Sequence, residues 1–248
     1  EIIRDNIDRS PLYGGKISGI GARYCPSFED KIMKFPHHET HLLFLEPEGE
    51  FTEEYYLNGI STSLPVDVQV EMLRSIPGLE RSIISRYAYA IEYDFLPPEQ
   101  MLRTLQLKKW ANILPAGQIN GTSGYEEAGG QGLVAGLNAA KIAEGAEPAE
   151  FGRENSYIGV MIDDLVTKDV VEPYRLFTSR AEYRLSLRQD NADLRLCQFA
   201  KDNRLIDSAK FAEFSEYREK FDIAIKILEA QTPDAKKLKE KFLGFGGI

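Results

Sequence analysis

The segment Ile113–Ala140 constrains the fold of this chain more than any other. Its sequence, ILPAGQINGTSGYEEAGGQGLVAGLNAA, predicts a short apolar strand, a glycine-bearing loop and a helix from about Glu126. In the helical part, small residues recur every four positions, at Ala128, Gly132, Gly136 and Ala140. On a helix this spacing gives one face with almost no side-chain bulk. Such a face predicts close approach of another backbone or a flat ligand, and tight helix–sheet packing without a ligand explains it equally well.

Periodicity divides the rest of the chain near residue 150. Before that point the pattern is mixed α/β, and after it apolar residues recur at helical spacing with few glycines. Leu96–Pro98 marks a candidate crossing between domains. The expected strands are Leu42–Leu45 and Ala88–Phe95, with a hairpin-type turn at Asn58–Gly59. The expected helices are Asp67–Ser75, Ser156–Thr167, Ser179–Gln189, Asn191–Asp202 and Ser208–Ala230.

Charge and cysteine content bound the function classes. The 248 residues carry a formal net charge of −9, which argues against a protein that coats nucleic acid, although a local basic face could still bind RNA. Cys25 and Cys197 form no disulfide framework, so a reducing cytoplasm is expected. No apolar run is long enough for a membrane helix, and no membrane association is expected. His37, His38 and His41 lack further nearby ligands, so no metal site is expected.

Arginines and aromatic side chains are interleaved between Arg175 and Arg188. Arg180, Arg184 and Arg188 are spaced by four, so a helix would place them on one face. Together with Arg175, this row suits the phosphates of an RNA, and the neighbouring tyrosines could stack on unpaired bases. A solvated face, paired with acids such as Glu182, is the alternative.

Cys25 lies between Arg23 and Lys31, and its thiol has two possible roles. Two nearby cations would lower the thiol pKa and yield a nucleophile. A buried structural thiol is the alternative, because most free cysteines are buried. Cys197 lies among apolar residues at helical spacing, which predicts a core position. Gly19–Gly21 begins like a dinucleotide-binding fingerprint, but a plain turn explains it better.

Eight segments, spread in order along nearly the whole chain, resemble one family. They are Asp8–Pro11, Arg23–Ser27, Glu29–Lys31, Phe44–Gly49, Asn58–Pro65, Ala90–Asp94, Ala116–Gly121 and Pro173–Leu185. Together they resemble the MnmG (GidA) family of tRNA uridine 5-carboxymethylaminomethyl modification enzymes. The tyrosine- and arginine-rich last segment separates this family from the related folate-dependent tRNA methyltransferases.

The resemblance implies an α/β protein in three parts. Residues 1–97 would belong to an inserted nicotinamide-binding domain, and residues 98–150 would be the closing part of a Rossmann-type FAD-binding domain. Residues 151–248 would start a mostly α-helical region. The family's N-terminal GxGxxG segment, its other cysteine and most of its C-terminal helices are absent here. The chain is therefore expected to be the middle of the enzyme and inactive by itself.

The resemblance also implies the chemistry. Family members bind FAD, use NADH and take a carbon from methylene-tetrahydrofolate. They are cytoplasmic homodimers that work with the GTPase partner MnmE. They install an aminomethyl-type group at carbon 5 of the wobble uridine in certain tRNAs.

Matching positions give the expected site residues. Cys25 matches a family cysteine implicated in catalysis near the modified base, Gln118 matches a flavin contact, and Gly21–Phe35 matches the NAD segment. The expected FAD site comprises Gly117, Gln118, Asn120, Gly121, Thr122 and Gly124. The expected NAD site comprises Gly21, Arg23, Tyr24, Pro26, Ser27, Glu29 and Lys31. The expected tRNA contacts are Arg175, Arg180, Arg184 and Arg188.

Two other function classes stay open. The chain could be a non-catalytic scaffold that docks tRNA and a partner, in which case colourless protein would still bind tRNA. A flavin disulfide reductase is less favoured, because the chain has no CxxC-type cysteine pair. FAD bound to the purified protein would favour the modifying enzyme.

Overall fold

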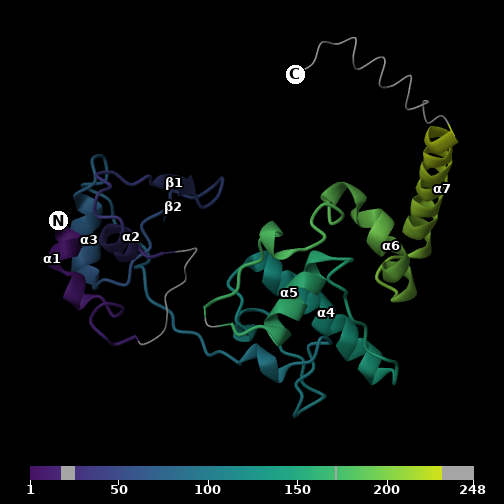
Figure 1. The fold of residues 1–248 in the computed structure, drawn as a ribbon. Coiled ribbons are helices and arrows are strands. Elements are labelled where there is room, and N and C mark those ends of the chain that lie inside the picture. Colours follow the sequence, from purple (N-terminus) through teal and green to yellow (C-terminus); the bar gives the residue numbers. More distant parts are fainter. Residues whose placement is uncertain (18–25, 171, 231–248) are drawn as a thin grey trace, which may run out of the picture.

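The chain forms two lobes joined by an extended segment (Figure 1). This computed structural model describes residues 1–17, 26–170 and 172–230. The first lobe contains α1 (Ile2–Asp5), α2 (Phe28–Lys34), β1 (Phe44–Pro47), β2 (Tyr55–Asn58) and α3 (Val66–Arg74). The second contains α4 (Tyr125–Ala143), α5 (Tyr157–Thr167), α6 (Ala192–Asp202) and α7 (Ser208–Ala230). Short 3₁₀ helices are η1 (Ile7–Arg9), η2 (Pro98–Gln100), η3 (Gln118–Asn120), η4 (Thr178–Arg180) and η5 (Gln189–Asn191).

The first lobe packs its helices around a small apolar core. Helix α3 forms close to its expected range, and its Val68 and Met72 are buried because they lie one helical turn apart. They cluster with Ile3, Ile60 and Leu64. This core is separate from the core of the second lobe.

Strands β1 and β2 pair antiparallel in the first lobe. The expected strand over Leu42–Leu45 begins two residues later, at Phe44. The connection between the strands is closed by the amide of Glu48, which donates to the carbonyl of Glu54 at 3.0 Å. The expected hairpin turn at Asn58–Gly59 is therefore wrong, because Asn58 ends β2 and Gly59 follows it, so neither residue joins the two strands.

Two further expected strands do not form in the part of the chain that the structure describes. Ala88–Phe95 is not a strand, and the Ala88 amide donates to the Gln69 side chain at 2.9 Å instead of to a neighbouring strand. The segment around Ile113 is also outside any strand. A strand requires a partner backbone at the right distance, which an apolar pattern alone does not supply.

The second lobe is built on α4 and α5, which lie against each other (Figure 1). Val134 of α4 and Leu165 of α5 are fully buried, together with Met101 and Leu105 from the preceding loop. Helix α5 begins where its sequence predicts, because Ser156 accepts a hydrogen bond from the Gly159 amide at 2.9 Å. Helices α6 and α7 match the expected helices almost residue for residue.

Residues 179–189 do not form the expected helix. After η4 the backbone makes a series of turns, in one of which the Leu187 amide donates to the Tyr183 carbonyl at 3.0 Å. Ala181 and Leu187 are both buried against Val160 of α5. On a helix, two residues six apart are rotated by about 240°, so they cannot face the same neighbour. Packing of both side chains therefore favours an irregular chain over a helix.

The small-residue face of α4 does not pack closely in the described chain. A side chain built at Gly132 or Gly136 would meet nothing within 4 Å. The opposite face carries the buried residues of α4, Glu127, Gln131, Val134, Ala135, Leu137 and Asn138. The close approach that the spacing predicts is therefore not made by the described residues.

Candidate functional site

The loop before α4 is shaped by two glycines in the left-handed region. Gly117 has φ +88° and Gly121 has φ +82°, and they flank η3. Only glycine adopts these angles without a steric penalty. At Gly121 the phenyl ring of Phe95 adds a second reason, because a Cβ there would lie 2.6 Å from the ring. The predicted loop residues are therefore close together, and their backbone conformation depends on glycine.

Gln131 holds this loop from inside the lobe. Its side chain is fully buried in α4, and its Oε1 accepts from the Gly117 amide at 2.7 Å and from Asn120 Nδ2 at 3.0 Å. Its Nε2 donates to Thr122 Oγ1 at 3.2 Å. Our sequence reasoning missed Gln131. The sequence feature that could have identified it is a polar residue at a position where the helical periodicity predicts an apolar, buried side chain.

Helix α4 begins directly after the loop. Its N-cap is Gly124, and no side chain caps the helix start. Glu127 is buried, with Oε1 accepting from the Leu176 amide at 3.0 Å and Oε2 lying 3.7 Å from Arg175 Nη1. A Cβ at Gly124 would overlap both Glu127 Oε2 and Arg175 Nη1. Gly124 is therefore needed for this close packing at the helix start.

Tyr174 joins the arginine-rich segment to the same loop. Its amide donates to the Gly121 carbonyl at 2.7 Å, and its carbonyl accepts from the Ser123 amide at 3.4 Å. Its hydroxyl donates to Asp164 Oδ2 at 3.0 Å. Burial, reinforced by the Asp164 carboxylate, raises the pKa of Tyr174 above its ordinary value. Arg180 lies over the tyrosine ring, 4.5 Å from its centroid.

The four predicted tRNA contacts do not share a helical face, because the helix is not formed. Arg175 and Arg180 face the lobe, since Arg175 approaches Glu127 and Arg180 Nε donates to the Arg175 carbonyl at 2.8 Å. Arg188 pairs with Asp190 at 2.9 Å. Arg184 is exposed and has no hydrogen bond or ion pair among the described residues.

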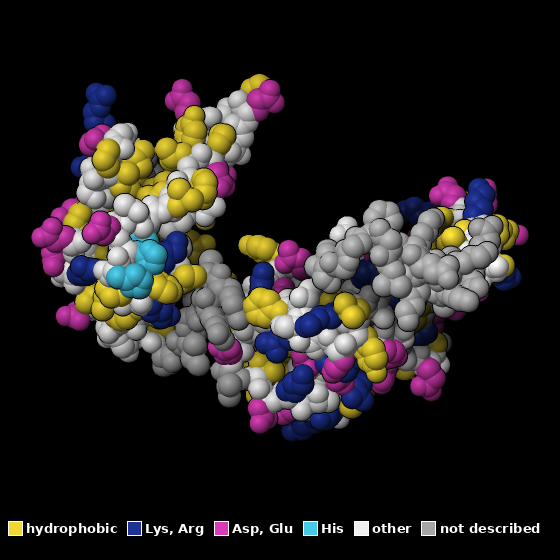
Figure 2. Space-filling model, turned by 45° about the horizontal axis from the view of Figure 1, so that its top comes forward, with side chains coloured by type: hydrophobic (Ala, Val, Ile, Leu, Met, Phe, Trp, Pro, Cys, Tyr) yellow, Lys and Arg dark blue, Asp and Glu magenta, His cyan; other side chains and the backbone are white. Residues whose placement is uncertain are grey.

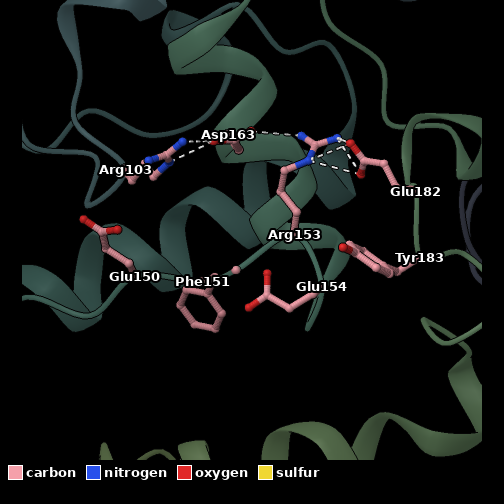
Figure 3. Close-up of a pocket in the computed structure, with 9 residues that line it drawn as sticks. Arg103, Glu150, Phe151, Arg153, Glu154, Asp163, Glu182 and Tyr183 are labelled. Carbon is pink, nitrogen blue, oxygen red and sulfur yellow. Dashed lines mark hydrogen bonds and ion pairs between the residues drawn. The ribbon is translucent and has the colours of Figure 1, made fainter.

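A cavity of about 500 Å³ lies beside this segment. Figure 3 shows Arg103 and Asp163 along its upper side, Glu150 at the left beneath Arg103, and Glu154 below Arg153. Arg153 makes ion pairs with Asp163, Asp164 and Glu182. Because its acids outnumber its bases and the arginines are already paired, the cavity does not offer a phosphate site.

The described part of the expected NAD segment is bound into the first lobe. Ser27 caps α2 by accepting from the Asp30 amide at 3.2 Å, and Lys31 Nζ donates to the Gly59 carbonyl at 2.9 Å. Glu29 is fully buried and accepts from the Ser63 amide at 2.9 Å. Ser27, Glu29 and Lys31 therefore hold the segment in place.

A second polar contact adjoins this segment. The Tyr13 hydroxyl donates to Asp30 Oδ1 at 3.0 Å. Burial and this carboxylate raise the pKa of Tyr13 to about 12. Pro26 is partly buried. Gly21, Arg23, Tyr24 and Cys25 lie outside the described residues.

The histidine side chains lie together on the first lobe (Figure 2). The ring centroids of His37 and His38 are 4.6 Å apart, and those of His38 and His41 are 6.4 Å apart. Within residues 1–17, 26–170 and 172–230, no group of histidine, cysteine or acidic side chains is arranged to hold a metal ion. The helices in these ranges are too short or too polar to cross a membrane.

The described chain is mostly helical with one two-stranded antiparallel sheet, and its glycine-bearing loop leads directly into the long helix α4. A family model described as glucose inhibited division protein A (GidA) matches residues 1–147. The chain belongs to the GidA family.

Curated relatives and solved structures agree with this membership. The "tRNA uridine 5-carboxymethylaminomethyl modification enzyme MnmG" of Clostridium novyi is 53% identical over 98% of this chain, and that of Aquifex aeolicus is 61% identical over 85%. The form I crystal structure of Aquifex aeolicus GidA matches with a TM-score of 0.81 and 56% identity over 92% of this chain.

The chain is much shorter than these relatives. It spans 38% of the Clostridium novyi protein, 34% of the Aquifex aeolicus protein and 38% of the crystallised GidA chain. The match therefore identifies the family and the fold of this region.

Proposed function

We propose that the intact protein modifies tRNA by adding an aminomethyl-type group to carbon 5 of the wobble uridine. The observation that carries this proposal is the identity of 53% and 61% to relatives named as tRNA uridine 5-carboxymethylaminomethyl modification enzymes. We extend it to FAD and NADH as cofactors, methylene-tetrahydrofolate as carbon donor, the GTPase partner MnmE, a homodimer and the cytoplasm. These further points rest on the family resemblance of the motifs.

We propose that the loop at residues 117–124 contacts FAD. The start of α4 has no side-chain cap, so its first amides are available to an electron-rich group. Asn120 Oδ1 is buried and has no hydrogen-bond partner among the described residues, as expected for a site that another group completes. Gln118 and Ile119 are exposed beside it.

FAD, when bound there, would supply hydride transfer between NADH and the substrate. The chain's own residues would bind and orient it. Gly117 and Gly121 hold the loop in backbone conformations that other residues rarely adopt, and the absence of a side chain at Gly124 leaves room for the Glu127 and Arg175 side chains at the start of α4. Helix α4 places partial positive charge at its start, and the carboxylates of Glu126 and Glu127 in its first turn already interact with that charge.

The NAD and catalytic assignments are proposals of the same kind. We propose that residues 21–35 bind NADH, with Ser27, Glu29 and Lys31 supporting the segment through the contacts described above. We propose that the Cys25 thiol acts on the modified base, as a nucleophile or proton donor.

For tRNA binding we favour Arg184 among the four arginines. Arg184 is exposed and unpaired among the described residues, whereas Arg175, Arg180 and Arg188 contact carbonyls or carboxylates of the chain. An unpaired guanidinium can bind a phosphate without first breaking an ion pair.

The test uses the intact protein in cells that lack their own copy. Wild-type protein is expected to restore modified wobble uridine, measured by mass analysis of tRNA nucleosides, and to contain FAD when purified. Colourless protein that binds tRNA but restores no modification would overturn the enzyme proposal in favour of the scaffold.

Cys25→Ser is expected to abolish the modified nucleoside while FAD content and tRNA binding stay near wild type. Cys197→Ser is the matched control. Burial, with a contribution from Asp193, raises the pKa of the Cys197 thiol, so it is a poor nucleophile and its loss should leave modification intact. Full modification by Cys25→Ser would assign that thiol a structural role.

A further inference from the structure

We propose that Gln131 is the positioning residue of the loop at residues 117–122, holding it in the conformation that accepts the cofactor. The proposal rests on the proposed use of FAD at this loop. It concerns a side chain inside α4 that the expected site did not include.

The evidence is a closed set of hydrogen bonds around one buried amide. Gln131 Oε1 accepts from the Gly117 amide at 2.7 Å and from Asn120 Nδ2 at 3.0 Å, while its Nε2 donates to Thr122 Oγ1 at 3.2 Å. Thr122 Oγ1 in turn donates to the Gly117 carbonyl at 3.2 Å. One side chain therefore fixes the beginning, middle and end of the loop.

The burial of this set gives it its strength. Gln131 and Asn120 are both 0% exposed and Thr122 is 2% exposed, so water cannot replace a lost bond without entering the lobe. Asn120 Nδ2 also donates to the Pro115 carbonyl at 2.6 Å, which extends the set to the residues before Gly117. Because Gln131 bonds to Gly117, Asn120 and Thr122 from inside the lobe, the backbone conformation of the loop is fixed before any ligand binds.

Glutamine is suited to this position because it both accepts and donates. Its side-chain oxygen accepts two hydrogen bonds while its side-chain nitrogen donates one. A hydrophobic residue of the same length, such as methionine, makes none of these hydrogen bonds. A glutamate at this position would still accept from Gly117 and Asn120 but could not donate to Thr122 when ionised.

The same helix offers a matched control. Asn138 is also 0% exposed, two turns further along the buried face of α4. Its Nδ2 donates to the Thr104 and Ala149 carbonyls at 3.0 and 2.9 Å, and its Oδ1 accepts from the Ala149 amide at 2.7 Å. It makes as many hydrogen bonds as Gln131, but it holds segments away from the loop.

The experiment compares Gln131→Met with Asn138→Leu in the intact protein. The free energy of unfolding is expected to fall in both variants, because each substitution leaves buried polar groups without a hydrogen-bond partner. Hydrogen exchange of the Gly117 amide in the FAD-free protein is expected to speed up at least about tenfold in Gln131→Met only. The dissociation constant of FAD, measured by quenching of its fluorescence, is expected to rise by about tenfold in the same variant only.

Gln131→Glu is the second variant, in case Gln131→Met does not fold. In this variant the Gly117 amide is expected to stay protected from hydrogen exchange. The dissociation constant of FAD is expected to rise by about threefold, because the donor to Thr122 is lost. Normal Gly117 protection and FAD affinity in Gln131→Met, or equal effects of both control and test variants, would overturn the proposal. Wild-type protein that binds no FAD would refute the proposed function, while the exchange of Gly117 would still decide whether Gln131 sets the loop.

Discussion

Asp164 is 1% exposed, yet three donors surround its carboxylate. Arg153 Nη1 lies 2.6 Å from Oδ1, Lys168 Nζ lies 2.5 Å from the same oxygen, and the Tyr174 hydroxyl donates to Oδ2. Burial by itself would raise the pKa of this carboxyl, but these hydrogen bonds outweigh burial and lower it below the ordinary value of 3.8. The charged form is therefore the one that stabilises the fold.

Asp164→Asn is expected to lower the free energy of unfolding by about 1–3 kcal/mol near neutral pH. The pKa is lower in the folded than in the unfolded state, so the stabilisation is complete above about pH 4 and is lost as the pH falls through the folded pKa. The difference between variant and wild type should therefore shrink in acid, measured by urea unfolding at about pH 7 and pH 3. Asp190→Asn, at an exposed ion pair, is the control and should change little at either pH. A penalty for Asp164→Asn that is constant with pH would contradict this account.

At the scale of elements, the sequence predicted secondary structure best where the conformation depends on residues close together in the chain. Ser156 caps α5, and the glycines at 117 and 121 shape the predicted loop, so both features could be placed from residue types alone. The irregular chain after η4 could not, because it depends on Ala181 and Leu187 reaching the same neighbour. The role of Gln131 could not be predicted from the sequence for a similar reason, since it depends on three hydrogen-bond partners whose positions are set only in the folded loop.

Substitution by alanine is expected to change the free energy of unfolding in opposite directions at two glycines that lie within helices. Gly136→Ala is expected to raise the free energy of unfolding by about 0.5–1 kcal/mol, because nothing lies within 4 Å and alanine favours a helix. Gly159→Ala should lower it by about 1–3 kcal/mol, because a Cβ there would lie 2.2 Å from the Gly152 carbonyl oxygen. Thermal unfolding of each variant, compared with the wild type, measures both effects. Destabilisation by Gly136→Ala would show that this face of α4 is covered in solution.

At the scale of the whole molecule, an acidic chain is proposed to bind a polyanion. The net charge is −9, and Figure 2 shows Lys and Arg side chains interspersed with acids on the second lobe. Long-range electrostatic attraction therefore does not favour tRNA binding by this chain. The affinity for tRNA has to come from local contacts with its phosphates and bases. Sequence predicted an arginine-rich tRNA surface but could not tell which arginines the fold would already use.

Arg184→Ala is expected to weaken tRNA binding by the intact protein and to reduce the salt dependence of the binding constant by about one unit, because one phosphate contact is lost. Arg188→Ala removes an equal charge at a guanidinium already paired with Asp190, so its effect on the slope should be smaller. Filter binding across a range of salt concentrations measures the slope. An unchanged slope in Arg184→Ala would place the RNA surface on other residues.

The two backbone hydrogen bonds of Tyr174 tie the arginine-rich segment directly to the glycine loop. A ligand that orders either stretch therefore removes freedom from the other, with no movement of a domain. Thermodynamic linkage is reciprocal, so any change that RNA at the proposed arginine-rich surface makes in the affinity of the loop for its proposed cofactor would be matched by an equal change in RNA affinity when the cofactor binds. The peptide bonds around Tyr174 would make substrate and cofactor mutual effectors.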